Sequence, residues 1–197
     1  MPAKAKFIAP MLLLKTDRLP DDASRWLYQL KLDGYRAIAY KTGGKLHLRS
    51  RNNKDFASRY PAVVSGLAKL PDETIIDGEV VAFDEEGRPS FNALQNYGSA
   101  PAAVVFYVFD VTMLGGKDVT SEPLESRLNI PERKVLPKLK EPVRYIGAFD
   151  VRLSDLIASV KAQGLEGVVA KRRDSRYESG LRTGAWQRCA STRDRSS

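Results

Sequence analysis

The chain has 197 residues, of which 43% are hydrophobic and 28% are charged, and its 32 Lys and Arg against 24 Asp and Glu give a net charge of +8. This composition is typical of a globular protein with a real apolar core, while a lone cysteine, Cys189, excludes an internal disulfide or a cysteine-rich zinc site, and a lone histidine, His47, excludes chemistry that needs paired histidines. No apolar run approaches 18 residues and the N-terminus lacks a signal-peptide core, so we expect a cytoplasmic protein that does not bind membranes and is monomeric.

Five stretches of the chain alternate in polarity or are continuously apolar, and they predict β-strands. They are residues 26–32, 35–41, 45–51, 74–83 and 104–111. Asp33-Gly34 predicts a turn that pairs the first two strands, and Thr42-Gly43-Gly44 predicts a hairpin before the third. The fifth stretch is almost wholly apolar and aromatic, so we expect it to be buried on both faces.

Helices are predicted over residues 58–70, 121–139 and 153–163. The first begins near Pro61, the second is interrupted by Pro131 and Pro137, and the third ends at Gly164. A short strand follows over residues 167–171. Strands joined by hairpins, with helices inserted irregularly, predict an α+β fold built on antiparallel sheets. We expect one domain over residues 1–190 and a polar tail over 191–197.

The charge is concentrated at the two ends of the chain. Residues 1–60 hold 13 basic and 5 acidic side chains, and residues 166–197 hold 8 and 4, whereas residues 61–165 hold 11 and 15. If the two basic ends converge in space, they create a field suited to phosphates. The alternative is a generally basic, solvated surface.

Four segments contain residues that can carry chemistry. Lys31 precedes the Asp33-Gly34 turn, which would present its amine to a cleft, and an amine attacks phosphorus only in its neutral form. Arg36 follows and can bind a phosphate. The alternative interpretation is a solvated lysine beside an ordinary hairpin turn.

The second segment is the apolar run 75–81, in which Glu79 can bind a divalent metal or a ribose hydroxyl; the alternative is a strand with one wet face. In the third, Phe109 can stack on a base or simply belong to the core. In the fourth, period-two alternation puts Val169 and Lys171 on one face, and Glu166 can reach a metal, although a plain strand is again the alternative.

Together, six segments follow the order of the collinear motifs of covalent nucleotidyltransferases. They are Lys31-Leu32-Asp33-Gly34-Tyr35-Arg36, Ser50-Arg51-Asn52, Asp77-Gly78-Glu79, Phe106 to Asp110, Glu166 to Lys171 and Trp186-Gln187-Arg188. From Phe7 to Trp186 the sequence resembles the adenylation domain of ATP-dependent DNA ligases, in particular the ligase domain of bacterial multifunctional end-joining ligases. The resemblance implies an ATP-grasp-like nucleotidyltransferase core and a role in DNA repair.

The resemblance also implies how ATP is bound and used. Lys31 would attack the α-phosphate and retain AMP as a phosphoramidate. Gln29, where the family often has glutamate, would face the adenine edge, and its amide oxygen can accept from the exocyclic amine. Phe109 would stack on adenine with Val169 on the other face.

The remaining residues implied by the resemblance are charged. Arg36 and Arg51 would hold nucleotide or nick phosphates, and Lys171 would neutralise the α-phosphate. Glu79 and Glu166 would bind Mg²⁺ or Mn²⁺, with Glu79 also in reach of the ribose. AMP would then pass to the 5′-phosphate of nicked duplex DNA. The ligase would act at the bacterial nucleoid, and other repair domains or proteins would be further partners.

Two departures from the family affect these expectations. The family's last motif usually has a lysine two residues after the tryptophan and another two residues later, whereas this chain has Arg188, which is expected to bind the nucleotide in place of the first lysine, and Ala190. The sequence then ends without the OB-fold that clamps DNA in ligases, so we expect slow self-adenylation and poor nick sealing. An RNA ligase, a capping guanylyltransferase and a non-catalytic nucleic-acid-binding remnant are the alternatives.

Overall fold

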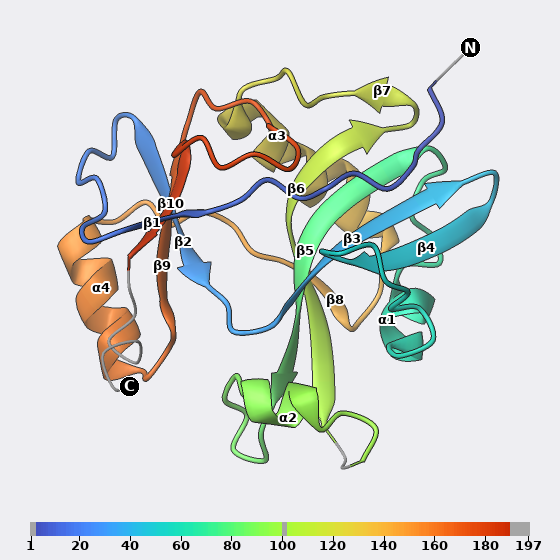
Figure 1. Cartoon of the computed structure of the whole chain (residues 1–197), viewed down its shortest axis with the longest axis horizontal. Coiled ribbons are helices and arrows are strands. Elements are labelled where there is room, and N and C mark those ends of the chain that lie inside the picture. Colours follow the sequence, from blue (N-terminus) through green and yellow to red (C-terminus); the bar gives the residue numbers. More distant parts are fainter. Residues whose placement is uncertain (1–2, 100–101, 190–197) are drawn as a thin grey trace.

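The computed structural model describes residues 3–99 and 102–189, and these form two sheets with few helices (Figure 1). The smaller sheet has the strand order β1-β10-β9-β2, and the larger has the order β4-β3-β5-β6-β7, with β8 added beside β6. The strands are β1 (Leu14–Thr16), β2 (Trp26–Lys31), β3 (Tyr35–Thr42), β4 (Lys45–Ser50), β5 (Thr74–Phe83), β6 (Ala103–Leu114), β7 (Lys117–Asp118), β8 (Val143–Tyr145), β9 (Gly167–Arg172) and β10 (Trp186–Cys189). Except for β1–β10 and β6–β8, neighbouring strands are antiparallel, as predicted.

The larger sheet is centred on β5 and β6 because both strands are almost continuously apolar. They pair from Ile75 opposite Met113 to Phe83 opposite Ala103, with irregularities after Ile75 and Asp77. Within the predicted stretch 104–111, every residue is buried except Tyr107, which is half-buried. The prediction of a strand buried on both faces is therefore confirmed.

The four α-helices are short and cover the sheets. They are α1 (Pro61–Gly66), α2 (Phe91–Gln95), α3 (Leu124–Ile130) and α4 (Leu153–Ala162). Helix α4 agrees with its prediction: it buries Leu153, Leu156 and Val160 against the smaller sheet, and Gly164 follows with a φ of +65° (Figure 1). Helix α1 is shorter than the predicted 58–70 and begins at Pro61.

The interruption predicted within residues 121–139 is present. Helix α3 ends at Ile130, and a π-helical turn, Pro131–Val135, and a 3₁₀ turn, Leu136–Lys138, follow it. Each of the two turns has its proline in its first two positions, where a missing backbone N–H is tolerated.

The prediction that the strands on either side of Asp33-Gly34 pair with each other is wrong. Strand β2 pairs with β9 and β3 pairs with β4 and β5, so the chain crosses from one sheet to the other at this dipeptide. A tight hairpin of this type needs a glycine with positive φ, which Gly43 and Gly44 have at +56° and +78° and Gly34 does not. Gly34 is instead required by close packing, because a Cβ there would lie 2.2 Å from the backbone oxygen of Val80.

Several short elements were not predicted: β1, β7, β8, β10 and α2. Strand β1 precedes β2 in the chain but joins the opposite edge of the smaller sheet, beside β10, after the N-terminal segment has crossed the molecule (Figure 1). The sheet therefore brings two strands from residues 1–60 beside two strands from residues 166–189. The predicted tail over residues 191–197 lies outside the described residues.

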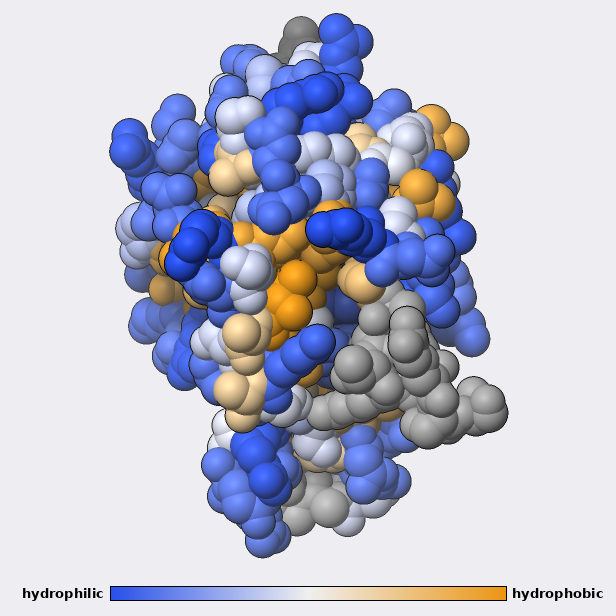
Figure 2. Space-filling view, turned by 90° about the vertical axis from the view of Figure 1, so that its left-hand side faces the viewer, coloured by the Kyte–Doolittle hydropathy of each residue, from blue (hydrophilic) through white to orange (hydrophobic). Residues whose placement is uncertain are grey.

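The face of the molecule on the side of α4 is largely hydrophilic (Figure 2). Seen from the side of α4, hydrophobic side chains gather in a hollow that polar residues surround (Figure 2). Large hydrophobic residues that are exposed are Leu14, Phe149, Val151 and Leu181. No helix in the described ranges is long and apolar enough to cross a membrane.

Candidate active site

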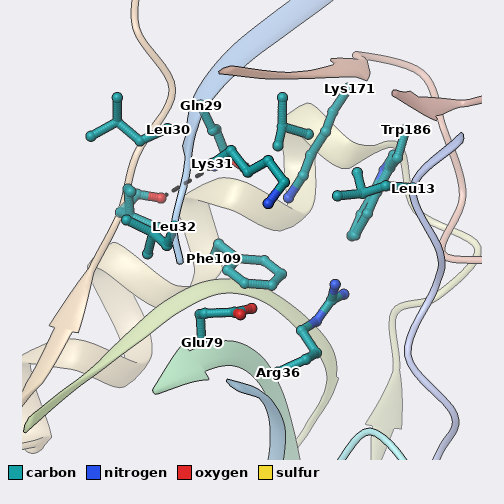
Figure 3. Close-up of a pocket in the computed structure, with 12 residues that line it drawn as sticks. Leu13, Gln29, Leu30, Lys31, Leu32, Arg36, Glu79, Phe109, Lys171 and Trp186 are labelled. Atoms are coloured by element: carbon teal, nitrogen blue, oxygen red, sulfur yellow. Dashed lines mark hydrogen bonds between the residues drawn. The ribbon is translucent and has the colours of Figure 1, made fainter. Parts of the chain in front are cut away.

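A pocket lies between the two sheets and receives side chains from both. The smaller sheet contributes Gln29 and Lys31 from β2, Val169 and Lys171 from β9, and Trp186 from β10. The larger sheet contributes Arg36 from β3, Glu79 from β5 and Phe109 from β6. In Figure 3 the Phe109 ring lies between the two lysines on one side and Glu79 and Arg36 on the other. Leu13, Leu30, Leu32 and Ile146 complete the lining.

Lys31 is held by Glu166 at the edge of the pocket. Lys31 is opposite Gly167 in the β2–β9 register, which brings Glu166 next to it, and the Lys31 amine forms an ion pair with Glu166 Oε1. Burial raises the pKa of Glu166, against the opposing effect of Lys31. Its second oxygen, Oε2, is buried and has no hydrogen-bond partner among the described residues.

Gln29 has a fixed orientation in the pocket wall. Its side chain is almost fully buried, and Nε2 donates to the backbone oxygen of Ile146 at 3.2 Å (Figure 3). The backbone N–H of Ile146 in turn donates to Val108, beside Phe109, at 2.9 Å. Only the amide nitrogen can donate to a carbonyl, so Oε1 is left as an acceptor.

Lys171 lies between two aromatic rings. Its amine is 4.3 Å from the centroid of the Phe109 ring and 3.9 Å from that of Trp186. Burial lowers the pKa of Lys171 to about 7, although the charge of Asp110 and the ring faces favour the ammonium form. This cation is therefore desolvated and suited to an incoming anion.

Arg36 and Glu79 line the opposite wall. The Arg36 guanidinium is bound by Asp77 through Nε at 2.5 Å and Nη2 at 2.6 Å, and it lies 4.6 Å from the centroid of the Phe109 ring. Burial raises the pKa of Glu79 to about 8, in spite of the nearby Arg36 and Lys31 charges. The pocket thus contains a carboxyl that a bound cation would help to ionise.

Seven of the ten predicted site residues line this pocket: Gln29, Lys31, Arg36, Glu79, Phe109, Val169 and Lys171. Glu166 reaches it through its ion pair with Lys31. The pocket does not include Arg51 or Arg188. Arg51 is exposed and its backbone N–H donates to the oxygen of Arg36 at 3.1 Å, while Arg188 is half-buried on β10, opposite Val169.

Other residues in and beneath the pocket were not predicted from the sequence. Ile146 and Leu13 come from outside the predicted elements and carry no polar group that would single them out. Trp186 belongs to the last motif, and the sequence predicts no role for it, although its ring is fully buried and makes a cation–π contact with the Lys171 amine. Tyr177 and Arg127 were not singled out at all, and both lie beneath the pocket in a buried polar network.

The donor set fits a hard divalent cation shared with phosphates. Within the described ranges there is no group of three or more His, Cys, Asp or Glu that could hold a metal unaided. Mg²⁺ is usually bound by one or two carboxylates together with substrate phosphates and water. Glu79 and the unpartnered Oε2 of Glu166 provide two such carboxylates.

Comparison with known proteins gives consistent matches. Residues 10–189 match the ATP dependent DNA ligase domain family. The multifunctional non-homologous end joining protein LigD of Pseudomonas aeruginosa is 37% identical over 177 residues, which cover 88% of this chain and 21% of that protein. LigD of Mycobacterium tuberculosis is 34% identical over 188 residues, which cover 91% of this chain and 23% of that protein. The chain thus spans less than a quarter of these relatives.

Solved structures match over almost the whole described chain. A mycobacterial DNA ligase D complexed with ATP and MES superposes with a TM-score of 0.80 at 31% identity, covering 93% of this chain and 60% of that one. The ligase domain of M. tuberculosis LigD gives a TM-score of 0.79 at 32% identity, covering 92% and 58%.

Proposed function

The chain belongs to the ATP-dependent DNA ligases and has the fold of their nucleotidyltransferase domain, and we propose that its pocket forms a lysyl-AMP at Lys31. The observation that carries the proposal is the position of the Lys31 amine. It projects from β2 into a pocket with an aromatic wall, a buried amide acceptor and two further cations. We include in the proposal that the two sheets enclose ATP in an ATP-grasp-like manner.

The proposed reaction is an in-line displacement at the α-phosphate. The neutral Lys31 amine forms a P–N bond and releases one proton to solvent, the bond between the α-phosphorus and its bridging oxygen breaks, and pyrophosphate leaves. Arg36 and Lys171 would hold the phosphates, and Phe109 and Val169 would hold the base. Mg²⁺ or Mn²⁺ bound by Glu79, Glu166 and the phosphates would offset the charge of the leaving pyrophosphate.

The buried amide of Gln29 favours adenine over guanine. Its free Oε1 can accept from an exocyclic amine at the purine 6-position, whereas the 6-oxo group of guanine would meet an acceptor. This observation supports ATP as the donor over the GTP of capping enzymes.

The wider role is also proposed. We expect AMP to pass to the 5′-phosphate of nicked duplex DNA and the strand to be sealed by the 3′-hydroxyl. The end-joining names of the relatives support a role in DNA repair, together with other repair domains or proteins. A monomer acting in the bacterial cytoplasm, at the nucleoid, is the corresponding expectation.

The test is covalent labelling with α-labelled ATP and Mg²⁺. The wild-type chain should retain label, Lys31→Ala should retain none, and Lys134→Ala, which removes an exposed lysine, should label like wild type. Equal labelling of the wild type and Lys31→Ala would contradict the assignment of the nucleophile. If unlabelled GTP in excess reduced the labelling as strongly as unlabelled ATP, a guanylyltransferase would be favoured instead. Nick sealing is measured in the same experiment as a separate activity, because in the family that the chain resembles an OB-fold clamps the DNA.

A further inference from the structure

The Tyr177 side chain lies beneath the pocket, in the loop that follows β9. It is buried, and its hydroxyl donates to Asp77 Oδ2 at 2.5 Å and accepts from the backbone N–H of Met11 at 3.2 Å. Both hydrogen-bonding functions of the hydroxyl are thus used, and the pKa of Tyr177 is raised by burial and by Asp77, which keeps the donor protonated.

Asp77 connects Tyr177 to Arg36. Its two carboxylate oxygens accept from Nε and Nη2 of Arg36, and Nη2 also approaches the backbone oxygen of Met11 at 3.4 Å. Arg36, Asp77, Tyr177 and the Met11 backbone therefore form a closed ring of hydrogen bonds. These bonds use Nε and Nη2, which leaves Nη1 for the pocket.

The ring is needed because a second carboxylate lies alongside. Asp77 is opposite Asp110 in the β5–β6 register, and both side chains are fully buried. Arg127 binds Asp110 through Nε and Nη2, both at 3.0 Å, so this cation is committed to Asp110. Asp77 consequently depends on Arg36 and on the Tyr177 hydroxyl for its stabilisation.

We propose that Tyr177 is a positioning residue that fixes the Arg36 guanidinium in the nucleotide pocket through Asp77. The inference rests on the proposed function, in which Arg36 holds a phosphate of ATP. Loss of the hydroxyl removes one of the three donors to Asp77, so the guanidinium is no longer held in one orientation over the Phe109 ring. Tyr177 itself lies outside the pocket lining and need not touch the nucleotide.

The test is a double-mutant cycle in affinity for α,β-methylene-ATP, measured by calorimetry. Tyr177→Phe keeps the ring that packs against Trp186 at 5.7 Å and should weaken binding about tenfold, as expected for a lost hydrogen bond to a charged group. Arg36→Lys keeps a charge beside Asp77 but not the planar fork, and in that background Tyr177→Phe should cost less than about threefold. Tyr60→Phe is the matched control, because the Tyr60 hydroxyl is buried without a hydrogen-bond partner among the described residues and Tyr60 does not line the pocket.

An equal loss from Tyr177→Phe in the wild-type and Arg36→Lys backgrounds would overturn the inference, since a general structural effect acts in both. Unchanged affinity of Tyr177→Phe in the wild-type background would overturn it as well. The labelling experiment is a separate readout: a chain that binds the analogue but retains no label would contradict the proposed function and leave the cycle to decide the role of Tyr177.

Discussion

At the scale of single side chains, Lys171 combines burial with an aromatic surrounding. Phe109 and Trp186 exclude water from its amine, and Asp110 supplies the compensating negative charge. A bound phosphate would stabilise the ammonium form and raise the pKa of Lys171 above its value of about 7.

This linkage predicts a pH dependence of nucleotide binding. Above pH 7 the free enzyme loses the Lys171 proton that the bound state retains, so affinity for α,β-methylene-ATP in EDTA should fall with rising pH, by up to about tenfold per unit. Glu79 has a pKa of about 8, and as it ionises its negative charge repels the phosphates and lowers the affinity further. Calorimetry at pH 6.5, 7.5 and 8.5 measures the slope. Lys171→Met should bind more weakly at pH 6.5 and show a smaller slope, whereas the same slope as wild type would contradict the assignment.

At the scale of the elements, Gly78 lies in β5 where the backbone and a ring of β6 leave no room for a side chain. A Cβ added there would lie 2.5 Å from the backbone oxygen of Tyr107 and 2.6 Å from the Phe106 ring. The irregularity between Asp77 and Gly78 occurs at the same place, one residue before Glu79. The glycine therefore lets the strand that carries Asp77 and Glu79 pack against β6.

Gly78→Ala should destabilise the fold, because the backbone of β5 or of β6 must move to make room for the methyl group. We expect the free energy of unfolding to fall by about 2–3 kcal/mol in urea titrations. Gly147→Ala is the control: the nearest atom to its added Cβ is 3.4 Å away, and its effect should stay within about 0.5 kcal/mol. Similar losses from the two substitutions would show that close packing at Gly78 is not the cause.

Helix α3 is tied to β6 by a buried ion pair. Arg127 and Asp110 are both fully buried, and Arg127 Nη1 also donates to the backbone oxygens of Glu122 at 2.6 Å and Ser175 at 2.9 Å. The guanidinium thus joins α3, β6 and the loop after β9 in one network.

Arg127→Met should be strongly destabilising because it leaves the Asp110 charge buried without its cation. The expected loss is about 3–5 kcal/mol of unfolding free energy, measured by chemical denaturation. Arg144→Ala, which breaks an exposed pair with Glu141, should cost less than about 0.5 kcal/mol. Comparable losses would mean that the Arg127 pair contributes no more than a surface pair.

Local patterns in the sequence predicted those helices and turns that are determined by neighbouring residues. The helical spacing of Leu153 to Val160 and the positive-φ glycines Gly43 and Gly44 needed no partner to be recognised. Asp33-Gly34 has the same hairpin signal, but its role is set by the backbone of β5, which no local pattern reveals. The pocket-lining residues Lys31, Glu79 and Lys171 were predicted from charged side chains on short apolar segments, and Gln29 from the family resemblance. Ile146, Tyr177 and Arg127 were not predicted, because their contacts are with distant segments.

At the scale of the whole molecule, the smaller sheet brings the two basic ends of the chain together. Strand β1 pairs with β10 and β2 pairs with β9, so segments from residues 1–60 and 166–197 form one sheet. Parts of the two basic ends are therefore neighbours in this sheet, whereas β3 and β4 of residues 1–60 belong to the larger sheet. Exposed arginines on these segments include Arg18, Arg25, Arg176 and Arg182.

This arrangement predicts that nicked duplex binds through its phosphates, with little dependence on base sequence. The logarithm of the binding constant should fall linearly with the logarithm of salt concentration, and Arg18→Ala combined with Arg25→Ala should lower the slope by about 1.8 if each arginine neutralises one phosphate. Lys134→Ala with Lys138→Ala removes two exposed lysines from the acidic middle segment and should leave the slope unchanged. Fluorescence anisotropy with two nicked duplexes of unrelated sequence measures both quantities. A slope that responds equally to the two pairs of substitutions would instead indicate binding by overall charge, without a defined surface at the joined ends.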